Sequence, residues 1–505
     1  MTILAAVVAR RVPPAELLVA GCAGVTAALL GLMVGVGHTV VAAGMALLAG
    51  ALVSGIQDWR RAIYGLLLFL PFSGIPYVLL YPNVRWASLL KDVLFVIPAY
   101  VGFLASRTGQ RRRVGPGAFP TVLLALFALL VVVQMFNPAL PNLIVGLIGA
   151  KVWFFYVPIC VLAYQMVQTR DDLARLLATM SIAAVVPAVV GLAEAALIYA
   201  GHADIVYGWY GGAAQHATQG FGEFEFVGGG VLRRIPSTFS FVAQYFAFTV
   251  SMVALTYAWW RGVLAKGRLA PVGAATWILL LLASLLSGAR AAFIFTPLLV
   301  VLIVLLEARD LRLPVGRLIL PSVLLVGVVT AILGASAGSL LGHAAAVGLA
   351  EFQDVFVTGF RHGLDATLAG LGTGSDTSGA RYAFKNPEQF TASLGTPYES
   401  WYVKTYLELG IAGLVLVLAI LTHLLVVGLR RHATLEDPRL RVVSACLIAL
   451  LVWNIVYGIK GQFIDMDPTN VYFWLIVGLL AKLPLLDQPP QPALLSGGQL
   501  VAQSR

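Results

Sequence analysis

The sequence predicts an all-α polytopic membrane protein, and two features of its composition support this fold class. Hydrophobic residues make up 60% of the 505 residues, while only 11% are charged. A soluble chain of this length could not bury so much apolar surface. Because a membrane-spanning helix needs about 20 apolar residues, the apolar stretches predict about 14 transmembrane helices. The net charge of +10 requires no nucleic acid partner, since membrane proteins collect basic residues in their cytoplasmic loops.

The predicted spans follow one another along the chain between polar or basic loops. Pro71, Pro76 and Pro158 are expected to break the third and sixth spans into shorter pieces, because proline removes a helix hydrogen bond. Membranes tolerate such breaks where protein or water covers the backbone. The expected spans are residues 15–36, 39–56, 62–80, 87–106, 119–136, 145–167, 181–200, 239–260, 272–287, 291–307, 318–335, 404–428, 442–459 and 470–486.

Basic residues orient the predicted bundle. Placing Arg10 and Arg11 in the cytoplasm puts most Lys and Arg residues on that side, as is usual for membrane proteins. Residues 201–237 and 336–403 then form two large external loops. In the second loop apolar residues recur at three- and four-residue steps, which indicates helices. We therefore expect a helical periplasmic cap, formed by these two loops, over the membrane bundle.

Two short segments of these loops have a pattern of their own. GFGEFEFVGGG, at residues 220–230, predicts a hairpin, and GLGTGSDTSG, at residues 370–379, predicts a flexible glycine-rich turn. The expected division of the chain is an N-terminal transmembrane bundle (1–200), a first periplasmic loop (201–237), spans with a Ser-x-x-Arg link (238–335), a large periplasmic loop (336–403), C-terminal spans (404–486) and a disordered cytoplasmic tail (487–505).

Cations near the external face form a candidate binding group. Charges close to membrane depth are costly and usually line an aqueous path or a site. Arginine presents a planar fork of donors that matches phosphate oxygens, so a convergent group would bind a diphosphate. The alternative is that each cation reaches to lipid headgroups or pairs with a carboxylate. The cations are Lys91, Lys151, Arg233, Arg234, Arg290, Arg361, Arg381, Lys385 and Lys404.

Carboxylates within the apolar stretches have simpler explanations. Glu194 and Asp92 lie inside predicted spans, and pairing with a neighbouring cation would account for each. Asp465-Met466-Asp467 has the Asp-x-Asp spacing that metal-binding glycosyltransferases use, but three residues match by chance. We therefore predict no metal site and no cofactor.

Three stretches of the chain resemble the superfamily of O-antigen polymerases, O-antigen ligases and related exopolysaccharide polymerases. RRIPSTFSFVAQYFAFTVSM, from residue 233, resembles its arginine, Ser-Thr-Phe turn and following span. SLLSGARAAFIF, from residue 284, resembles its Ser-x-x-Arg link between adjacent spans. GTPYESWYVKTYLELGIAGL, from residue 395, resembles the end of its large periplasmic loop. The order and loop placement of the three stretches support the resemblance more than any one of them.

The resemblance implies a metal-independent glycosyltransferase of the GT-C type at the periplasmic face of the bacterial inner membrane. Its donor would be an undecaprenyl-diphosphate-linked oligosaccharide. Its partners would be membrane lipids, a chain-length regulator and export proteins. Ligases of the family usually carry His-Asn where this chain has Glu399-Ser400, which favours a polymerase. A ligase and a lipid-linked oligosaccharide flippase remain the alternatives.

Roles for individual residues follow from the same resemblance. Glu399 would be the base or the anchor of the acceptor hydroxyl, since a positioned carboxylate can take its proton; the alternative is that Glu399 caps the next helix. Arg290 would bind the diphosphate together with Arg233 or Arg234. The further substrate-binding candidates are Arg361, Arg381, Lys151 and Lys404 as diphosphate or sugar ligands, and Tyr398, Trp401 and Tyr402 as stacking partners of sugar rings.

Overall fold

The computed structural model describes residues 39–81, 85–106, 119–213, 224–225, 231–232, 234–264, 267–289, 291–308, 352–384 and 387–488. Predicted spans 15–36 and 318–335, and the predicted tail from residue 489 onward, lie outside these ranges. Within them the fold is helical, apart from β1 (Phe224–Glu225) and β2 (Val231–Leu232), which pair antiparallel. The predicted hairpin is thus confirmed, and the chain is an α-helical membrane protein.

Six helices of the described part are long and apolar enough to cross a membrane. They are Leu143–Met166, which comprises α9 (Leu143–Phe154) and α10 (Ile159–Met166); Arg170–Tyr199, which comprises α11 (Arg170–Ala183) and α12 (Val185–Tyr199); Val242–Leu264, which comprises α15 (Val242–Tyr257) and the π-helical η5 (Ala258–Leu264); α22 (Trp401–Thr434); α23 (Pro438–Tyr457); and α24 (Thr469–Asp487). The full number of spans stays a prediction.

Shorter helices complete the described fold. In chain order they are α3 (Thr39–Gln57), α4 (Trp59–Phe69), α5 (Gly74–Leu79), α6 (Arg85–Lys91), α7 (Ile97–Ala105), α8 (Thr121–Met135), α13 (Ala203–Tyr210), α16 (Ala270–Leu285), α17 (Ala292–Glu307), α20 (Gly359–Ala366) and α21 (Pro387–Leu394). Single turns join some of them, among them η1 (Leu70–Phe72), η2 (Asp92–Val96), η7 (Phe352–Thr358), η8 (Ser378–Ala383) and η9 (Phe463–Asp465).

Two of the three expected prolines break predicted spans, whereas Pro76 lies inside α5 and does not break it. Pro71 lies in η1, between α4 and α5, and Pro158 is the N-cap of α10, just after α9 ends. In both places the missing backbone N–H ends the preceding helix. Residues 62–80 and 145–167 are therefore pairs of short helices rather than single rods.

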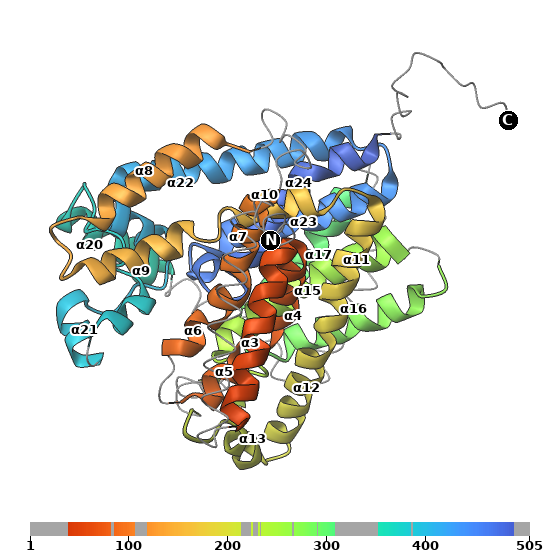
Figure 1. The fold of residues 1–505 in the computed structure, drawn as a ribbon, viewed down its shortest axis with the longest axis horizontal. Coiled ribbons are helices and arrows are strands. Elements are labelled where there is room, and N and C mark those ends of the chain that lie inside the picture. Colours follow the sequence, from red (N-terminus) through yellow and green to blue (C-terminus); the bar gives the residue numbers. More distant parts are fainter. Residues whose placement is uncertain are drawn as a thin grey trace, which may run out of the picture.

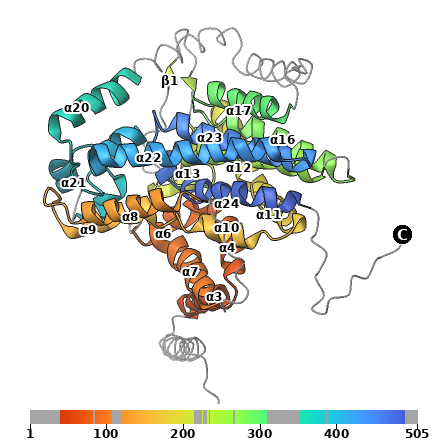
Figure 2. The same cartoon turned by 90° about the horizontal axis from the view of Figure 1, so that it is seen from above.

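The buried spans form the centre of the molecule. In Figure 2, α23 and α24 lie between α3 and α7 on one side and α17 on the other. In Figure 1, α8 and α22 run side by side along the upper edge, while α3, α4 and α12 lie below them and run steeply away from that edge. The apolar parts of α15, α23 and α24 are 83%, 78% and 89% buried, against 33% for α22. Most of α22 therefore lies at the periphery.

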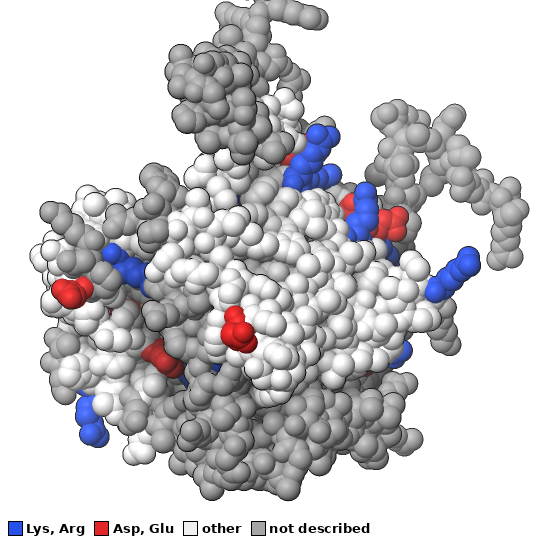
Figure 3. Space-filling view, turned by 90° about the horizontal axis from the view of Figure 1, so that it is seen from below, with Lys and Arg blue, Asp and Glu red and all other residues white. Residues whose placement is uncertain are grey.

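Apolar side chains cover the outer faces of the peripheral helices. Val122, Leu129 and Val133 of α8 are exposed, as are Val415 and Leu418 of α22. Charged side chains are sparse on the face drawn in Figure 3, where most of the described surface is uncharged. Such a surface suits a lipid environment, since water would penalise so much exposed apolar area.

Helix α22 is broken at Gly410. This residue has φ 70° and ψ −170°, a backbone conformation that only glycine adopts readily. Chain from another part of the sequence fills the break, because Leu371 N donates to Leu407 O (2.7 Å) and Ile411 N donates to Leu368 O (3.1 Å). The predicted span 404–428 thus comprises a short buried half-helix, ending before Gly410, and a long peripheral half.

Candidate functional site

The segment that fills the break begins at Leu368 and continues into the predicted turn at residues 370–379, called here the glycine-rich loop. Its backbone packs directly on α9: a Cβ atom on Gly374, where φ is +90°, would lie 2.2 Å from Val145 O. Thr373 Oγ1 donates to Gly146 O (2.9 Å). The loop is largely buried, so the expectation of a flexible turn was wrong. Its glycines permit close packing of backbone on backbone.

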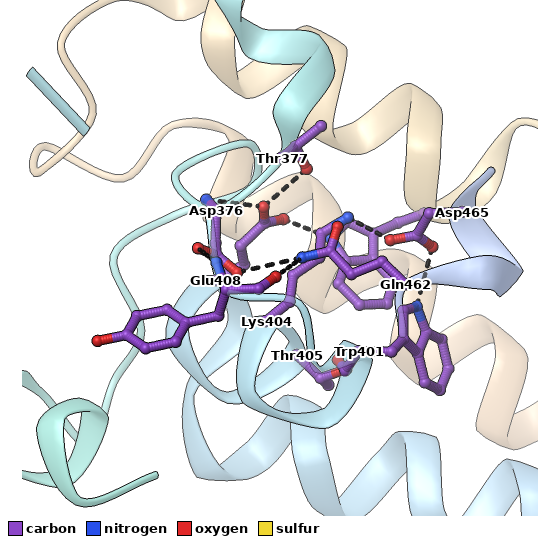
Figure 4. Close-up of polar contacts among 10 residues, drawn as sticks. Asp376, Thr377, Trp401, Lys404, Thr405, Glu408, Gln462 and Asp465 are labelled. Carbon is purple, nitrogen blue, oxygen red and sulfur yellow. Dashed lines mark hydrogen bonds and ion pairs between the residues drawn. The ribbon is translucent and has the colours of Figure 1, made fainter. Parts of the chain in front are cut away.

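Four charged side chains meet between this loop, α22 and the loop after α23. We call Asp376, Lys404, Glu408 and Asp465 the α22 network (Figure 4). Lys404 is fully buried and forms an ion pair with Asp465. Glu408 is also fully buried, and its carboxylate accepts hydrogen bonds from Asp376 N (3.0 Å) and from Trp153 Nε1 (2.6 Å). Buried charges require such compensation, because their desolvation is costly.

Asp376 has the weakest compensation in the α22 network. Its Oδ1 atom accepts a hydrogen bond from Tyr398 N (2.9 Å), and its Oδ2 atom lies 3.4 Å from Gln462 Nε2. No ion pair to a lysine or arginine is found for it among the residues described. Burial raises the pKa of the Asp376 carboxyl well above its usual range, and the charge of Glu408 acts in the same direction.

A second buried cluster, the Lys91 network, consists of Lys91, Asp92, Lys151, Tyr156 and Asp467. Lys91 Nζ lies 2.9 Å from Asp92 Oδ1 and 3.2 Å from Asp467 Oδ1. Lys151 Nζ lies 2.6 Å from Asp92 Oδ2, and the hydroxyl of Tyr156 donates to Asp92 (2.8 Å). The expectation that Asp92 pairs with a neighbouring cation is confirmed.

The loop between α23 and α24 joins the two networks. It supplies Asp465 to Lys404 and Asp467 to Lys91. Both carboxylates of the Asp-x-Asp motif are therefore paired with buried ammonium groups. The spacing that resembles a metal motif serves here to connect two ion-pair clusters.

A small apolar pocket borders the α22 network. It lies between α8, α9, α22 and α24. Aromatic rings form much of its wall, among them Trp153, Trp401 and Trp474, and Asp465 and Asn470 are its polar residues. The pocket thus places aromatic surface next to the buried ion pair of Lys404 and Asp465.

The predicted Ser-Thr-Phe turn is held by a buried acid. Glu194 of α12 accepts hydrogen bonds from Ser237 N (2.9 Å) and from the hydroxyl of Tyr210 (2.6 Å). These are its partners in the described structure, in place of the cation that we expected. Ile235 N donates to Ser287 O (3.0 Å). The turn therefore lies beside the Ser-x-x-Arg link, although about 50 residues separate them.

The three stretches that resemble one family converge on the C-terminal end of α23. The ring of Tyr457 lies 5.9 Å from that of Phe246 in the first stretch and 5.1 Å from that of Phe295 in the second. In the third stretch, Trp401 N donates to Gly458 O (2.9 Å). Sequence order does not require this convergence; it results from the packing of α15, α17 and α22 against α23.

Two predicted stacking residues are well covered by protein. Trp401 and Tyr402 are 5% and 6% exposed. Trp401 Nε1 donates to Asp465 (2.9 Å), and the hydroxyl of Tyr402 donates to Ile455 O (2.7 Å). Tyr398 is half-buried. Their stacking on sugar rings stays a prediction. In the structure, Trp401 and Tyr402 join the short buried half of α22 to α23 and to the loop that follows it.

Glu399 differs from its neighbours. Its side chain is exposed, and within the described part of the chain it has no ion-pair or hydrogen-bond partner. Ser400 is the N-cap of α22, and its hydroxyl accepts from Val403 N. The alternative role for Glu399, capping the next helix, thus belongs to Ser400.

The predicted cations that the structure describes do not form one group. Lys404 belongs to the α22 network and Lys151 to the Lys91 network. Arg381 is half-buried against the ring of Tyr382 (5.0 Å). Arg361 is exposed on α20, and Arg234 is half-buried at the start of the Ser-Thr-Phe turn. The remaining predicted residues, Arg233 and Arg290, lie outside the described residues, as does Lys385.

Sequence reasoning missed several members of the site. Glu408 had a usable signal: it is a single carboxylate in an apolar run, four residues after Lys404 and hence on the same helix face. Asp376 and Gln462 had no comparable signal, because each lies in a loop whose fold depends on distant parts of the chain.

The chain matches no protein-family model, and no curated protein matches it.

Proposed function

We propose that this protein is a glycosyltransferase of the bacterial inner membrane. It would join undecaprenyl-diphosphate-linked oligosaccharide repeat units into a cell-surface polysaccharide, an exopolysaccharide or an O-antigen. The basis is the resemblance of three stretches to polysaccharide polymerases and ligases. The family's reaction is metal-independent. In the proposed reaction, side chains of this protein act as the base and stabilise the leaving diphosphate.

The observation that carries the proposal is the meeting of these three stretches around Tyr457 and Gly458. Stretches that share one site in a family must lie together in the fold, and unrelated matches have no reason to converge. Phe246, Phe295 and Trp401 all contact this short end of α23. Buried ion pairs beside it add support, because such clusters are common at functional sites.

In the proposed reaction an acceptor hydroxyl attacks the anomeric carbon of the donor saccharide. Glu399 accepts the proton of that hydroxyl. The new glycosidic C–O bond forms as the bond from the anomeric carbon to the diphosphate breaks, and the lipid diphosphate leaves with the electron pair. Arg290, with Arg233 or Arg234, compensates the charge that develops on the diphosphate.

The apolar pocket would contact the part of the lipid carrier nearest the diphosphate without enclosing it. Its wall of Trp153, Trp401 and Trp474 offers aromatic surface to isoprenoid groups, and the pocket borders the α22 network. In this proposal the chain crosses the membrane about 14 times, the site faces the periplasm, and residues 201–237 and 336–403 form a cap. A chain-length regulator and export proteins would act with it.

The first experiment is to delete the gene in its own host and to identify the lipid-linked saccharides that accumulate. Single repeat units facing the periplasm support a polymerase. Long chains still attached to the carrier, with unmodified acceptor, indicate a ligase. Units trapped on the cytoplasmic leaflet overturn both and indicate a flippase.

Two variants test the assigned residues in the complemented strain. Glu399→Gln and Arg290→Ala are expected to abolish polymer while membrane insertion and protein level stay normal. Glu388→Gln is the matched control for the carboxylate, since Glu388 is an exposed acid of the neighbouring α21. Polymer of normal amount from both variants would refute the site assignment.

A further inference from the structure

Both main-chain polar groups of Tyr398 are held by side chains from other parts of the fold. Tyr398 N donates to Asp376 Oδ1 of the glycine-rich loop (2.9 Å). Tyr398 O accepts from Gln462 Nε2, in the loop after α23. Gln462 Nε2 also lies 3.4 Å from Asp376 Oδ2. Asp376 and Gln462 thus bind the backbone N–H and C=O of the same residue, Tyr398, and also lie next to each other.

The residues that follow Glu399 are fixed as well. Trp401 N donates to Gly458 O (2.9 Å), and the Ser400 hydroxyl caps the half-helix. Ser400 and Trp401 are buried. Glu399 is therefore a single exposed residue between two anchored backbone positions, and the exposed carboxylate itself has no partner in the described structure.

An exposed side chain between two anchored backbone positions is useful at an active site, because its position relative to a substrate is then fixed. A side chain that must meet a substrate has to be held in position by the groups around it, and anchoring its backbone is one way to do this when the side chain itself is exposed. A misplacement of about 1 Å in a reacting group can cost about 100-fold in rate. An ordinary surface glutamate needs no such support, because its position affects neither stability nor chemistry.

We propose that Asp376 and Gln462 are positioning residues, which clamp Tyr398 and so fix the backbone that presents Glu399 to the acceptor hydroxyl. This inference rests on the proposed function, because it gives Glu399 the role of base. It adds two residues for which the sequence offered no role. Asp376 acts through Tyr398 and does not itself meet the substrate, since it is 5% exposed.

The protonation of Asp376 suits this clamp. Burial raises the pKa of its carboxyl well above the usual range, and a neutral carboxyl keeps an acceptor oxygen for Tyr398 N. The charged groups that face it are Glu408 and Lys404 of α22 and Asp465 of η9. Asparagine has nearly the same shape and keeps the Oδ1 acceptor for Tyr398 N, while its Nδ2 atom replaces the Oδ2 atom near Gln462. It should therefore preserve the hold on Tyr398 N, whereas alanine removes it.

The experiment compares Asp376→Asn, Asp376→Ala and Gln462→Ala in the full-length protein, purified in lipid nanodiscs. Hydrogen exchange of the peptide that contains Tyr398 reports the clamp without reference to activity. The turnover rate of an undecaprenyl-diphosphate-linked repeat unit reports whether Glu399 is correctly placed as the base. Thr405→Val is the matched control, because Thr405 is a buried polar residue of the same half-helix whose hydroxyl donates only to Trp401 O.

We expect Asp376→Ala to speed exchange at Tyr398 roughly tenfold, the loss of one hydrogen bond, and to lower turnover by about 100-fold. Gln462→Ala is expected to act in the same direction. Asp376→Asn and Thr405→Val should retain both properties. A purely structural role for Asp376 would lower the melting temperature and active fraction of the alanine variant without changing the turnover of the folded fraction.

Unchanged exchange in Asp376→Ala would overturn the clamp. Faster hydrogen exchange at Tyr398 with unchanged turnover would show that the clamp has no role in catalysis. If wild-type protein turns over no lipid-linked saccharide while Tyr398 stays protected, then the proposed function has failed, and the clamp remains as a structural feature with its role in catalysis overturned.

Discussion

The positive charge of Lys404 compensates the buried negative charges of neighbouring carboxylates, and its contribution to stability can be measured. It is fully buried and pairs with Asp465, close to the equally buried Glu408. Replacing it by methionine preserves the length of the side chain and removes the charge. The carboxylates then remain buried without a cation, which typically costs about 3 kcal/mol or more. We expect Lys404→Met to lower the free energy of unfolding by about 3 kcal/mol, as measured by thermal unfolding in detergent.

A second substitution separates lost charge from lost packing. Lys404→Met combined with Asp465→Asn removes both members of the pair and should recover part of the stability. Arg430→Met, at the exposed far end of α22, is the matched control and should change stability by no more than about 0.5 kcal/mol. Full additivity of the two substitutions would contradict a direct pair.

Asp376 gives the stability of the protein a defined pH dependence. Because burial raises the pKa of its carboxyl in the folded state, the folded state binds a proton that the unfolded state releases above about pH 4, the ordinary aspartate pKa. Its contribution to stability is therefore fully present below about pH 4 and is lost as pH rises through the raised pKa. An asparagine side chain cannot titrate, so Asp376→Asn should remove this loss.

The measurement is the melting temperature of wild type minus that of Asp376→Asn, taken from about pH 4 to about pH 8. Other titrating groups contribute equally to both proteins and cancel in the difference. We expect the difference to become more negative as pH rises. A difference that is constant over this range would mean that the folded protein does not perturb Asp376.

At the scale of single elements, the sequence predicted what depends on local chemistry. The breaks at Pro71 and Pro158 follow from the missing N–H of proline. The break at Gly410 was not predicted, because one glycine in an apolar run is compatible with a helix. It exists because a loop from elsewhere in the chain pairs with the backbone on both sides of it.

The same limit applies to the candidate site. Lys404 and Trp401 were named as substrate-binding candidates because they stand next to an apolar span, and that role stays a prediction. Asp376 was missed because glycine-rich sequence looks like a linker, while its order here comes from packing on α9. Local pattern does not reveal which distant backbone will bury a loop.

Because α22 is broken at Gly410, we expect alanine to destabilise the protein strongly at this position and not at Gly428 of the same helix. At Gly410, φ is 70°, and a Cβ atom would lie 2.5 Å from the carbonyl carbon of Ala369. We expect Gly410→Ala to destabilise the protein by at least about 2 kcal/mol. Gly428 is the control in the same helix, since its Cβ would meet side chains at 3.7 and 3.9 Å. Gly428→Ala should be neutral or should stabilise by up to about 1 kcal/mol.

Melting temperatures in one detergent provide the comparison. Equal effects at the two positions would mean that α22 runs through Gly410 as a regular helix. A large loss at Gly410 alone supports the inserted loop, because only there does the added methyl group meet fixed backbone rather than flexible side chains.

At the scale of the whole molecule, the fold places two exposed glutamates at opposite ends of α22. Glu399 precedes the helix, and Glu436 follows it. The long half, residues 411–434, spans roughly 36 Å at 1.5 Å per residue, enough to cross a hydrocarbon core of about 30 Å. Arg430 and Arg431 near its C-terminal end favour a cytoplasmic location for that end. The proposed periplasmic site therefore requires Glu399 and Glu436 to face different compartments.

Single cysteines at these two positions test the requirement with a maleimide that does not cross membranes. Glu399→Cys should react in intact spheroplasts, and Glu436→Cys only after permeabilisation. A chain with Cys22→Ser is the background for both variants and the blank, because Cys160 and Cys446 are buried while Cys22 lies outside the described residues. The reverse pattern would move the site to the cytoplasm, where a polymerase that uses periplasmic donors could not act. Reaction of both positions in intact spheroplasts would mean that α22 does not cross the membrane, although it is the longest apolar helix of the described fold.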